Sequence, residues 1–445
     1  MTTMSRCATL ATSLRMGVYC LDVSENRGKP GLWRRLGPGL ITGAADDDPS
    51  GIATYAQAGA HFGFGLGWTL LLSYPLMVAI QAISARIGRT TGRGIAANLR
   101  SHFPGWLVQT TVGVLFVANV LNLGADLGAM AEAATLMVPM PGWVYVVGFA
   151  LACAGGPTFL KQAHYTAALK WLTASLLAYF ATLCVVHVSW GEFIEGLLWP
   201  RLTLDRHFWL MVVAILGTTI SPYLFFWQAA QEVEDTKAEP LRAPLLQKPG
   251  QAPDAFARIR IDTLIGMAIS NLVGLAIMAT AAATLHAHGK HDIDTAAQAA
   301  QALRPLAGEG AAALFALGII GTGLLSVPVL AGSAAYAMGE ARRWPVGLSR
   351  APRHARAFYG TIAVATLLGA LENVVSLKPL EALVWAAVLN GIAAAPIMAL
   401  IMLLSARKAT MGKFCISRRL AVAGWIATGV MGAASLVFAL LSLTP

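Results

Sequence analysis

Three aspartates interrupt an apolar stretch near the start of the chain, in the segment GPGLITGAADDDPSGIATYAQAGA. Inside a membrane a carboxylate costs at least about 2.5–3.5 kcal/mol on insertion scales, so its presence indicates a binding or transport role. Pro49 removes a backbone donor and Gly51 loosens the chain, which predicts a helix break next to Asp48. The freed backbone groups and the carboxylates could bind an ion or another polar solute. The alternative is that the aspartates lie in a loop and that the first apolar helix begins after them.

The three carboxylates cannot all face one ion if they stand on helical geometry, because consecutive helical residues point about 100° apart. We expect Asp48 to be the direct ligand and Asp47 to be the next candidate. Asp46 is assigned an outer-shell or vestibule role.

A second interruption occurs in the segment LGTTISPYLFFWQAAQEVED, where Pro222 stands in the middle of another apolar stretch. The hydroxyl groups of Thr218 and Ser221 could satisfy freed backbone groups or supply ligand oxygens. Taken alone, this pattern is also that of an ordinary proline kink. Two interruptions five spans apart are typical of an inverted repeat with a site between its halves.

These segments belong to a chain whose composition indicates a membrane protein. The 445 residues are 56% hydrophobic and only 12% charged, whereas soluble domains average about 25% charged residues. Apolar stretches of about 20 residues, the length that spans the hydrocarbon core, recur along the chain. We predict eleven spans: 38–59, 64–85, 106–137, 143–160, 165–188, 207–230, 262–286, 311–337, 357–374, 380–404 and 421–443.

The basic residues predict the orientation of these spans. The net charge is +10, and most of the 32 Lys and Arg residues fall in alternate loops on one side. The positive-inside rule therefore places the N-terminus in the cytoplasm and the C-terminus outside, in a plasma (inner) membrane. Because anionic lipid explains the basic loops, nucleic acid is not expected as a partner.

The two interrupted segments resemble the natural resistance-associated macrophage protein (NRAMP) family of divalent-metal transporters. The family's first helix has Gly-Pro-Gly, eight residues and then Asp-Pro-Gly-Asn, and this chain has Gly37-Pro38-Gly39 and Asp48-Pro49-Ser50-Gly51 at the same spacing. The resemblance covers most of the chain. It implies an all-α membrane protein with a leucine-transporter-like fold of two inverted five-helix repeats and one extra helix. The implied divisions are a cytosolic tail at 1–36 and one transporter domain at 37–443, with repeats at about 37–188 and 207–404 and the extra helix at about 421–443.

The resemblance also implies a site and a cargo. It implies Asp48 as the metal ligand, helped by the oxygens of Ser221, Thr218 and Gly51. Ser221 stands where the family has a methionine, and Tyr223 where it has a histidine. Losing a soft thioether favours harder ions such as Mg²⁺ or Mn²⁺, so the chain resembles most the divergent branch in which magnesium transport is known.

Four further residues are candidates for an ion or proton pathway. Asp126 and Glu132 lie in the third predicted span, where acids mark such pathways by default. Their alternative is a structural role, with partners such as Asn119 or Asn122. Gln228 could line the inner path or make a helix-packing hydrogen bond, and Tyr223 is the fourth candidate. The acidic run Glu232, Glu234 and Asp235 is expected to be a solvated helix end.

The leading hypothesis is a carrier, not an enzyme, that moves a divalent metal cation by alternating access, with or without protons, and uses no cofactor. One alternative keeps the fold but changes the substrate to a small organic solute such as an amino acid or amine. A second alternative is a membrane sensor that transports nothing, which is disfavoured because the chain has no soluble signalling domain.

Overall fold

The helices of this computed structural model are the framework of the candidate site. The structure describes residues 38–159, 177–374 and 378–443, and within them it contains helices and no strands. The described residues include seven helical segments long and apolar enough to cross a membrane. The fold is therefore the all-helical membrane fold that the sequence predicts.

Most predicted spans correspond to one long helix each. These helices are α4 (Gly67–Thr91), α6 (Gly105–Thr135), α7 (Gly142–Phe159), α13 (Ala252–Thr284), α16 (Ala311–Arg342), α17 (Arg356–Glu372), α18 (Pro379–Ala406) and α20 (Arg418–Leu443). The fifth predicted span lies partly outside the described residues, and its described part contains α9 (Leu177–Val185).

The first and sixth predicted spans are each divided into two helices. The first consists of α2 (Pro38–Asp46) and α3 (Pro49–Phe62), and the sixth of α11 (Arg206–Thr219) and α12 (Pro222–Ala238). In both, a proline opens the second helix, where its missing N–H and fixed φ do no harm. The aspartates are thus at an interruption with helix on both sides, and the loop alternative is wrong.

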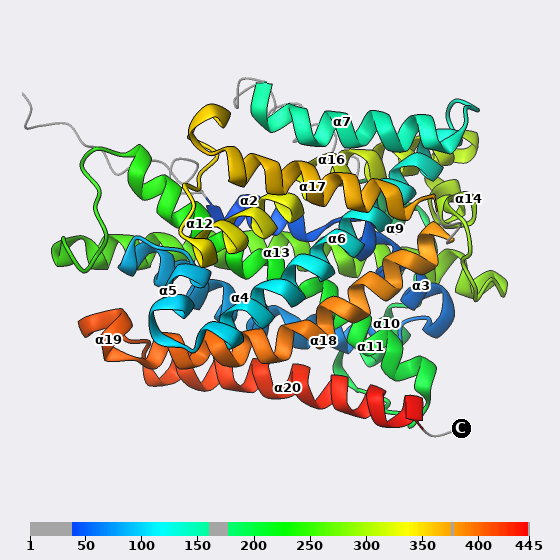
Figure 1. The fold of residues 1–445 in the computed structure, drawn as a ribbon. Coiled ribbons are helices and arrows are strands. Elements are labelled where there is room, and N and C mark those ends of the chain that lie inside the picture. Colours follow the sequence, from blue (N-terminus) through cyan, green and yellow to red (C-terminus); the bar gives the residue numbers. More distant parts are fainter. Residues whose placement is uncertain (1–37, 160–176, 375–377, 444–445) are drawn as a thin grey trace, which may run out of the picture. The chain divides into compact units, whose positions relative to one another are not determined.

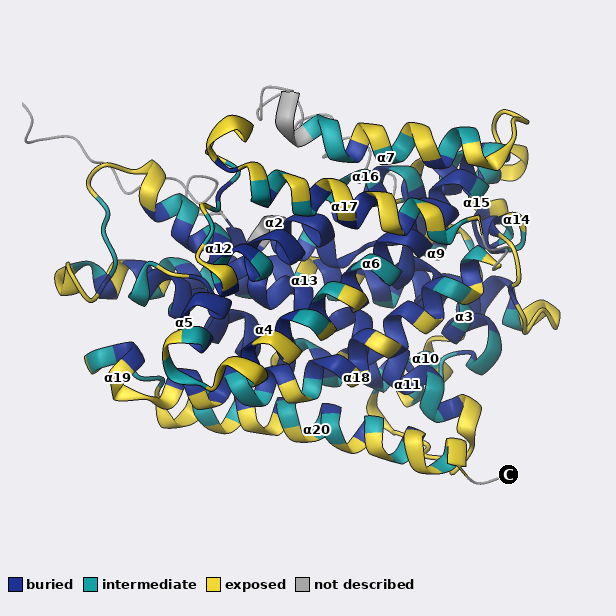
Figure 2. Cartoon of the chain, in the orientation of Figure 1, coloured by how far each residue is buried: buried dark blue, intermediate teal, exposed yellow. Residues whose placement is uncertain are grey.

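The interrupted helices lie in the interior of the described helices. In Figure 1, α2 and α13 lie between α7 and α17 on one side and α20 on the other. Figure 2 shows much of α2, α3 and α13 in the colour of buried residues, whereas exposed residues are frequent on α7, α17 and α20. Eleven residues of α3 are buried, from Pro49 to Ala60. Its neighbours include α13, α18, α11 and α6, so any site at the break is surrounded by protein.

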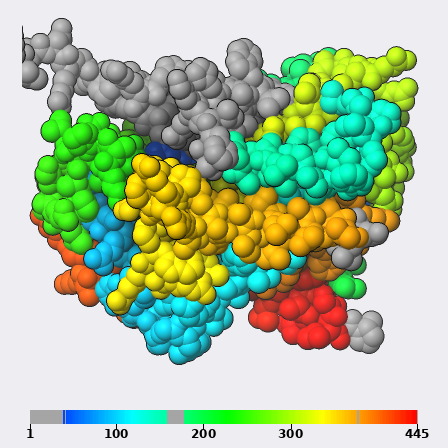
Figure 3. Space-filling model, turned by 45° about the horizontal axis from the view of Figure 1, so that its top comes forward, coloured from blue at the N-terminus to red at the C-terminus, as the bar shows by residue number. Residues whose placement is uncertain are grey.

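The outer surface of the peripheral helices is apolar, which is the inverse of a soluble protein. Large exposed hydrophobic side chains include Val117, Leu151, Leu367, Leu389 and Leu436. The space-filling view in Figure 3 shows α7 and α17 together on one face. Such a surface requires lipid around it.

Glycines let the interrupted helices approach their neighbours closely. A Cβ at Gly43 of α2 would lie 2.3 Å from the carbonyl oxygen of Gly266 on α13. A Cβ at Gly217 of α11 would lie 2.0 Å from the carbonyl oxygen of Ala387 on α18. Small residues at helix contacts are the usual device of membrane helix packing. Gly43 stands three residues before the last residue of α2, and Gly217 stands two residues before the last residue of α11. Both close contacts therefore lie near the breaks.

Short helices connect the long ones. They are α5 (Ile95–His102), α10 (Trp190–Leu198), α14 (Ala296–Ala300), α15 (Arg304–Ala307) and α19 (Lys408–Met411), with 3₁₀ turns at 249–251, 286–288, 301–303, 308–310, 352–354 and 412–414. The described residues from Pro38 onwards form one compact unit by their contacts.

The end of α12 differs from expectation at one residue. Glu232 is fully buried, and its carboxylate forms an ion pair with Arg258 of α13. The prediction of a solvated helix end is therefore wrong for Glu232, because a basic residue on the neighbouring helix supplies the partner that a buried charge needs. Glu234 and Asp235 are partly exposed.

Candidate functional site

The first break is organised by the carboxylate of Asp48. This residue has extended backbone (φ −73°, ψ 169°) and is the N-cap of α3. Its Oδ1 accepts hydrogen bonds from the backbone N–H of Gly51 at 2.7 Å and from the hydroxyl of Ser50 at 2.8 Å. Negative charge at a helix N-terminus is favourable, so one oxygen of the carboxylate is fixed by its own helix.

The other oxygen of Asp48 faces two different helices. Oδ2 lies 3.1 Å from Nδ2 of Asn122 on α6 and 3.3 Å from the hydroxyl of Tyr223 on α12, and both groups donate towards it. The Tyr223 hydroxyl also lies 3.0 Å from the carbonyl oxygen of Ala45, at the end of α2. A phenol has one hydrogen, so Tyr223 is shared between the two acceptors. The side chain of Asp48 is 1% exposed, and its neighbours here are neutral.

The second break contributes backbone oxygens and a hydroxyl. Ser221, between α11 and α12, turns its hydroxyl back towards the carbonyl oxygens of Gly217 at 2.5 Å and Thr218 at 3.0 Å. It therefore satisfies carbonyls at the C-terminus of α11, as the sequence allowed. A Cβ added to Gly51 would lie 3.1 Å from Oγ1 of Thr218. The two breaks are thus in contact.

Two of the three aspartates face α13, and the third, Asp48, faces other helices. The hydroxyl of Ser270 on α13 lies 2.6 Å from Oδ2 of Asp46 and 3.1 Å from Oδ1 of Asp47, whereas Asp48 faces α6 and α12. No group of three or more His, Cys, Asp or Glu side chains that could hold a metal ion occurs in the described ranges. Asp48 is therefore the carboxylate that faces α6 and α12, and Asp47 would have to turn away from Ser270 to join it on one cation.

The two acids of α6 are in different surroundings. Asp126 is fully buried, and its Oδ2 accepts a hydrogen bond from Ser326 of α16 at 3.0 Å. Glu132 is half-buried, and its Oε1 accepts from the backbone N–H of Ala296 at 2.8 Å, at the start of α14. The suggested amide partners are engaged elsewhere, because Asn119 donates to the carbonyl of Leu330 and Asn122 donates to Asp48.

Gln228 of α12 links the two interrupted spans through a hydrogen bond to α2. Its Oε1 accepts a hydrogen bond from the hydroxyl of Thr42 on α2, and the residue is fully buried. The helix-packing hydrogen bond considered for Gln228 is therefore present, and its Nε2 has no hydrogen-bond partner among the described residues.

Three polar residues that contact the first interrupted span were not recognised as such from the sequence. Asn122 was considered only as a partner of Asp126, although it donates to Asp48. Ser270 contacts Asp46 and Asp47, and Asp262 of α13 accepts from the backbone N–H of Gly39 at 2.6 Å. The available signal was the presence of polar residues in apolar spans, but their spacing does not reveal which helix they face.

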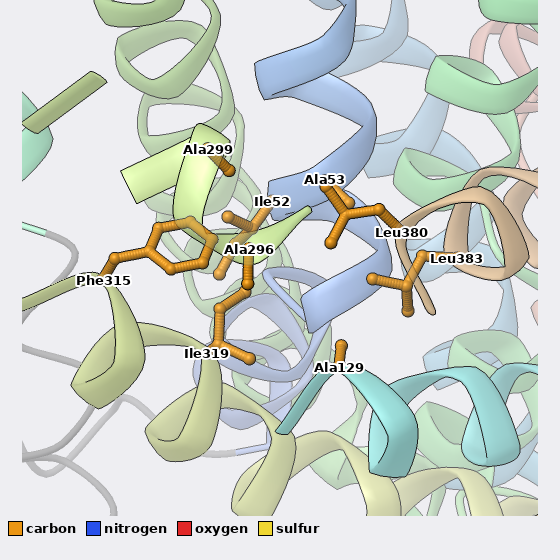
Figure 4. Close-up of a pocket in the computed structure, with 9 residues that line it drawn as sticks. All are labelled: Ile52, Ala53, Ala129, Ala296, Ala299, Phe315, Ile319, Leu380 and Leu383. Carbon is orange, nitrogen blue, oxygen red and sulfur yellow. The ribbon is translucent and has the colours of Figure 1, made fainter. Parts of the chain in front are cut away.

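An apolar seal lies next to the site, on the side towards α14. Figure 4 shows side chains from five helices, α3, α6, α14, α16 and α18, around a void of about 10 Å³. They include Ile52 and Ala53 of α3, Phe315 and Ile319 of α16, and Leu380 and Leu383 of α18. A void of this size is at the lower limit for one water molecule. On this side the site is closed by apolar side chains.

The sequence matches one family over almost its whole length. The sequence profile described as natural resistance-associated macrophage protein-like matches residues 39–441. The divalent metal cation transporter MntH of Yersinia enterocolitica is 30% identical over 305 residues, which are 66% of this chain and 69% of that protein. MntH of Aeromonas hydrophila is 28% identical over 309 residues, 66% of this chain and 70% of that protein.

Solved structures show the same fold at low sequence identity. The manganese transporter of Eremococcus coleocola, solved with an aromatic bis-isothiourea substituted compound, matches with a TM-score of 0.75 at 16% identity, over 93% of this chain and 88% of that one. The nucleobase-cation-symport-1 family transporter Mhp1 matches with a TM-score of 0.56 at 16% identity, over 91% of this chain and 93% of that one. These likenesses show that the chain has the fold of these transporters.

Proposed function

The chain belongs to the NRAMP family, and from this premise we propose that it moves a divalent metal cation, Mg²⁺ or Mn²⁺, across a membrane by alternating access. The family consists of integral membrane transporters and not of enzymes. The relatives named above are divalent metal cation transporters, and the cation is the cargo of this chain.

The observation that supports the proposal best is the position of Asp48. Its fully buried carboxylate stands where the two interrupted helices touch, and Oδ2 faces other helices instead of its own. The C-terminal ends of α2 and α11 lie beside it, and their carbonyl groups give that region partial negative charge. A buried anion beside the C-terminal ends of two helices is suited to a cation.

The ligands of the proposed site are Asp48 and the neutral oxygens around it. We assign Thr218, Gly51 and Ser221 to its neutral oxygen ligands, with Asp47 as a further carboxylate on the α13 side. In the described structure the Ser221 hydroxyl donates to carbonyls of α11, so a hydroxyl lone pair is the part of Ser221 that would face the cation. Pro49 and Pro222 keep the backbone groups at the two breaks from closing into continuous helix.

The type of ligand favours a hard cation. The groups that contact Asp48 are an amide, a phenol, a hydroxyl and a backbone N–H. None of them is a sulfur ligand, and oxygen sites suit Mg²⁺, Ca²⁺ and Mn²⁺, whereas thioethers select softer ions.

The close packing around Asp48 favours an ion over an organic solute. The apolar void beside α3 has about 10 Å³, and the carboxylate is in contact with side chains of α6 and α12. An amino acid would require these contacts to open, whereas one ion replaces hydrogen bonds with coordination bonds. The organic solute therefore remains the second candidate.

Protons are a further proposed partner of the transport. Asp126 is the buried acid on α6 next to the site, and Glu132, Gln228 and Tyr223 extend the polar path along α6 and α12.

The orientation in the membrane is also proposed. We place the N-terminus in the cytoplasm and the C-terminus outside. A phosphatase fused after residue 443 should show activity outside the cell. Activity only in the cytoplasm would indicate the opposite orientation.

Flux into proteoliposomes at a controlled membrane potential tests the proposal. We expect saturable uptake of Mg²⁺ or Mn²⁺ by the wild-type protein. A pH-sensitive dye inside the same vesicles would show whether protons enter with the metal. Saturable uptake of an amino acid or amine without any metal flux would support the second candidate instead.

A further inference from the structure

The two oxygens of the Asp48 carboxylate have different surroundings. Oδ1 receives two donors from the first turn of α3, so it serves as the helix cap. Oδ2 receives its donors from α6 and α12, through Asn122 and Tyr223. A cation that binds to Asp48 without uncapping α3 must therefore approach Oδ2 and replace these donors.

Asn122 leaves one polar atom without a partner at this place. The residue is fully buried, and its Nδ2 lies 3.1 Å from Oδ2 of Asp48. Its Oδ1 has no hydrogen-bond donor within the described part of the chain. A buried acceptor left unsatisfied costs about 1–3 kcal/mol, and such an atom in a native structure calls for an explanation.

An asparagine amide can serve both states of a cation site. With the site empty, its N–H group stabilises the bare carboxylate. With a cation on Oδ2 the same N–H would be repelled, while the amide oxygen is a normal ligand for a hard cation. The terminal torsion of asparagine is soft and roughly two-fold, so a turn about this bond exchanges the two groups.

We propose that Asn122 is a ligand and specificity residue of the transported cation: its amide donates to Asp48 when the site is empty and coordinates the ion through Oδ1 when it is filled. This inference rests on the proposed function, because it assumes that the cation binds at Asp48. It extends the ligand set to α6, which otherwise contributes Asp126 and Glu132 to the proposed pathway.

Asn119 is a matched control on the same helix. It is also an asparagine, it is 1% exposed, and its amide donates to the carbonyl of Leu330 on α16 instead of to a carboxylate. A change at Asn119 therefore tests the effect of a lost buried amide in α6 without touching Asp48.

The experiment measures metal binding to the purified full-length protein by isothermal titration with Mg²⁺, Mn²⁺ and Cd²⁺. We expect Asn122→Leu, which is similar in size but has no ligand, to weaken Mn²⁺ binding by at least about 10-fold, as loss of a group at a metal site typically does. Asn122→Cys should raise the affinity for Cd²⁺ relative to Mg²⁺, because a sulfur ligand prefers the softer ion. Asn119→Leu and Asn119→Cys should leave affinities and preference as in the wild type.

The outcomes separate this inference from the proposed function. If Asp48→Asn abolishes binding but both Asn122 variants behave like the wild type, Asn122 is not a ligand and the proposed function stands. If Asp48→Asn binds Mn²⁺ normally, the proposed function itself fails. Should Asn122→Leu not yield folded protein, the metal preference of Asn122→Cys decides, since an unchanged ratio of Cd²⁺ to Mg²⁺ affinity overturns the inference.

Discussion

The two helix breaks share one architecture and differ in chemistry. Each follows a glycine that presses its helix onto a neighbour, and each is followed by a helix that opens with proline. At the first break the residue before the proline is Asp48, which caps the following helix. At the second it is Ser221, whose hydroxyl turns back to the preceding helix.

This difference indicates a division of roles between the halves of the site. The first break supplies the negative charge, and the second supplies neutral oxygens and a phenol. Because charge dominates the binding of a divalent ion, variants at the first break should act on whether the ion binds. Variants at the second break should act on which ion is preferred and on how well the helices pack.

The largest expected effect is that of Asp48→Asn. Asparagine keeps the side-chain oxygen that caps α3, so the protein should fold, but the anion is lost and uptake of Mg²⁺ and Mn²⁺ should fall to the background of empty liposomes. Asp205→Asn is the matched control, because Asp205 is the N-cap of α11 and accepts from the N–H of Phe208 at 2.8 Å. Equal uptake by Asp48→Asn and Asp205→Asn would show that the charge of Asp48 is dispensable.

The next effect concerns packing at the second break. Gly217→Ala places a methyl group against the backbone of α18, and overpacking of this kind typically destabilises by about 1–3 kcal/mol. We expect a lower melting temperature in detergent, with unchanged preference between metals. Gly113→Ala on α6 is the control, since a Cβ there meets nothing within 4 Å. Equal melting temperatures for the two variants would contradict the close contact of α11 with α18.

A change of preference is expected from Ser221→Met. A thioether at the second break adds a soft ligand beside Asp48. The affinity for Cd²⁺ relative to that for Mg²⁺ should therefore rise by about 10-fold, which is 1.4 kcal/mol. Competition between Cd²⁺ and Mg²⁺ in the flux assay measures this ratio. If the ratio stays at the wild-type value, residue 221 does not face the ion.

The smallest expected effect is that of Ser221→Ala. It removes a neutral hydroxyl whose hydrogen bonds are made to carbonyls of α11, a contribution of about 0.5–1.5 kcal/mol. Apparent affinity should therefore change by only about two- to ten-fold, as read from the concentration dependence of Mn²⁺ uptake. Loss of uptake as complete as in Asp48→Asn would contradict the division of roles between the two breaks.

Much of the fold was predictable from the sequence because its signals are local. Apolar length predicts the spans, and the proline and aspartate residues of each interrupted span predict the breaks to within a few residues. The contact between the breaks was predictable from their spacing in an inverted repeat. The structure bears it out in the approach of Gly51 to Thr218.

The partners of individual side chains were not predictable in the same way. The position of Asn122 one turn before Asp126 gives no sign that its amide contacts Asp48, because that contact depends on how α6 is rotated against α3. The partner of Glu232 is Arg258, 26 residues further along the chain on another helix. Such pairings are set by tertiary packing, which no local pattern encodes.

The most direct test of the account is to locate the ion itself. Crystals or grids of the full-length protein prepared with Mn²⁺ should show a metal peak, identified by its anomalous signal or by comparison with a metal-free map. The account predicts this peak within about 2.5 Å of Oδ2 of Asp48, at coordination distance, between the ends of α2 and α11. A well-occupied peak elsewhere, with Asp48 still bound to Asn122 and Tyr223, would contradict it.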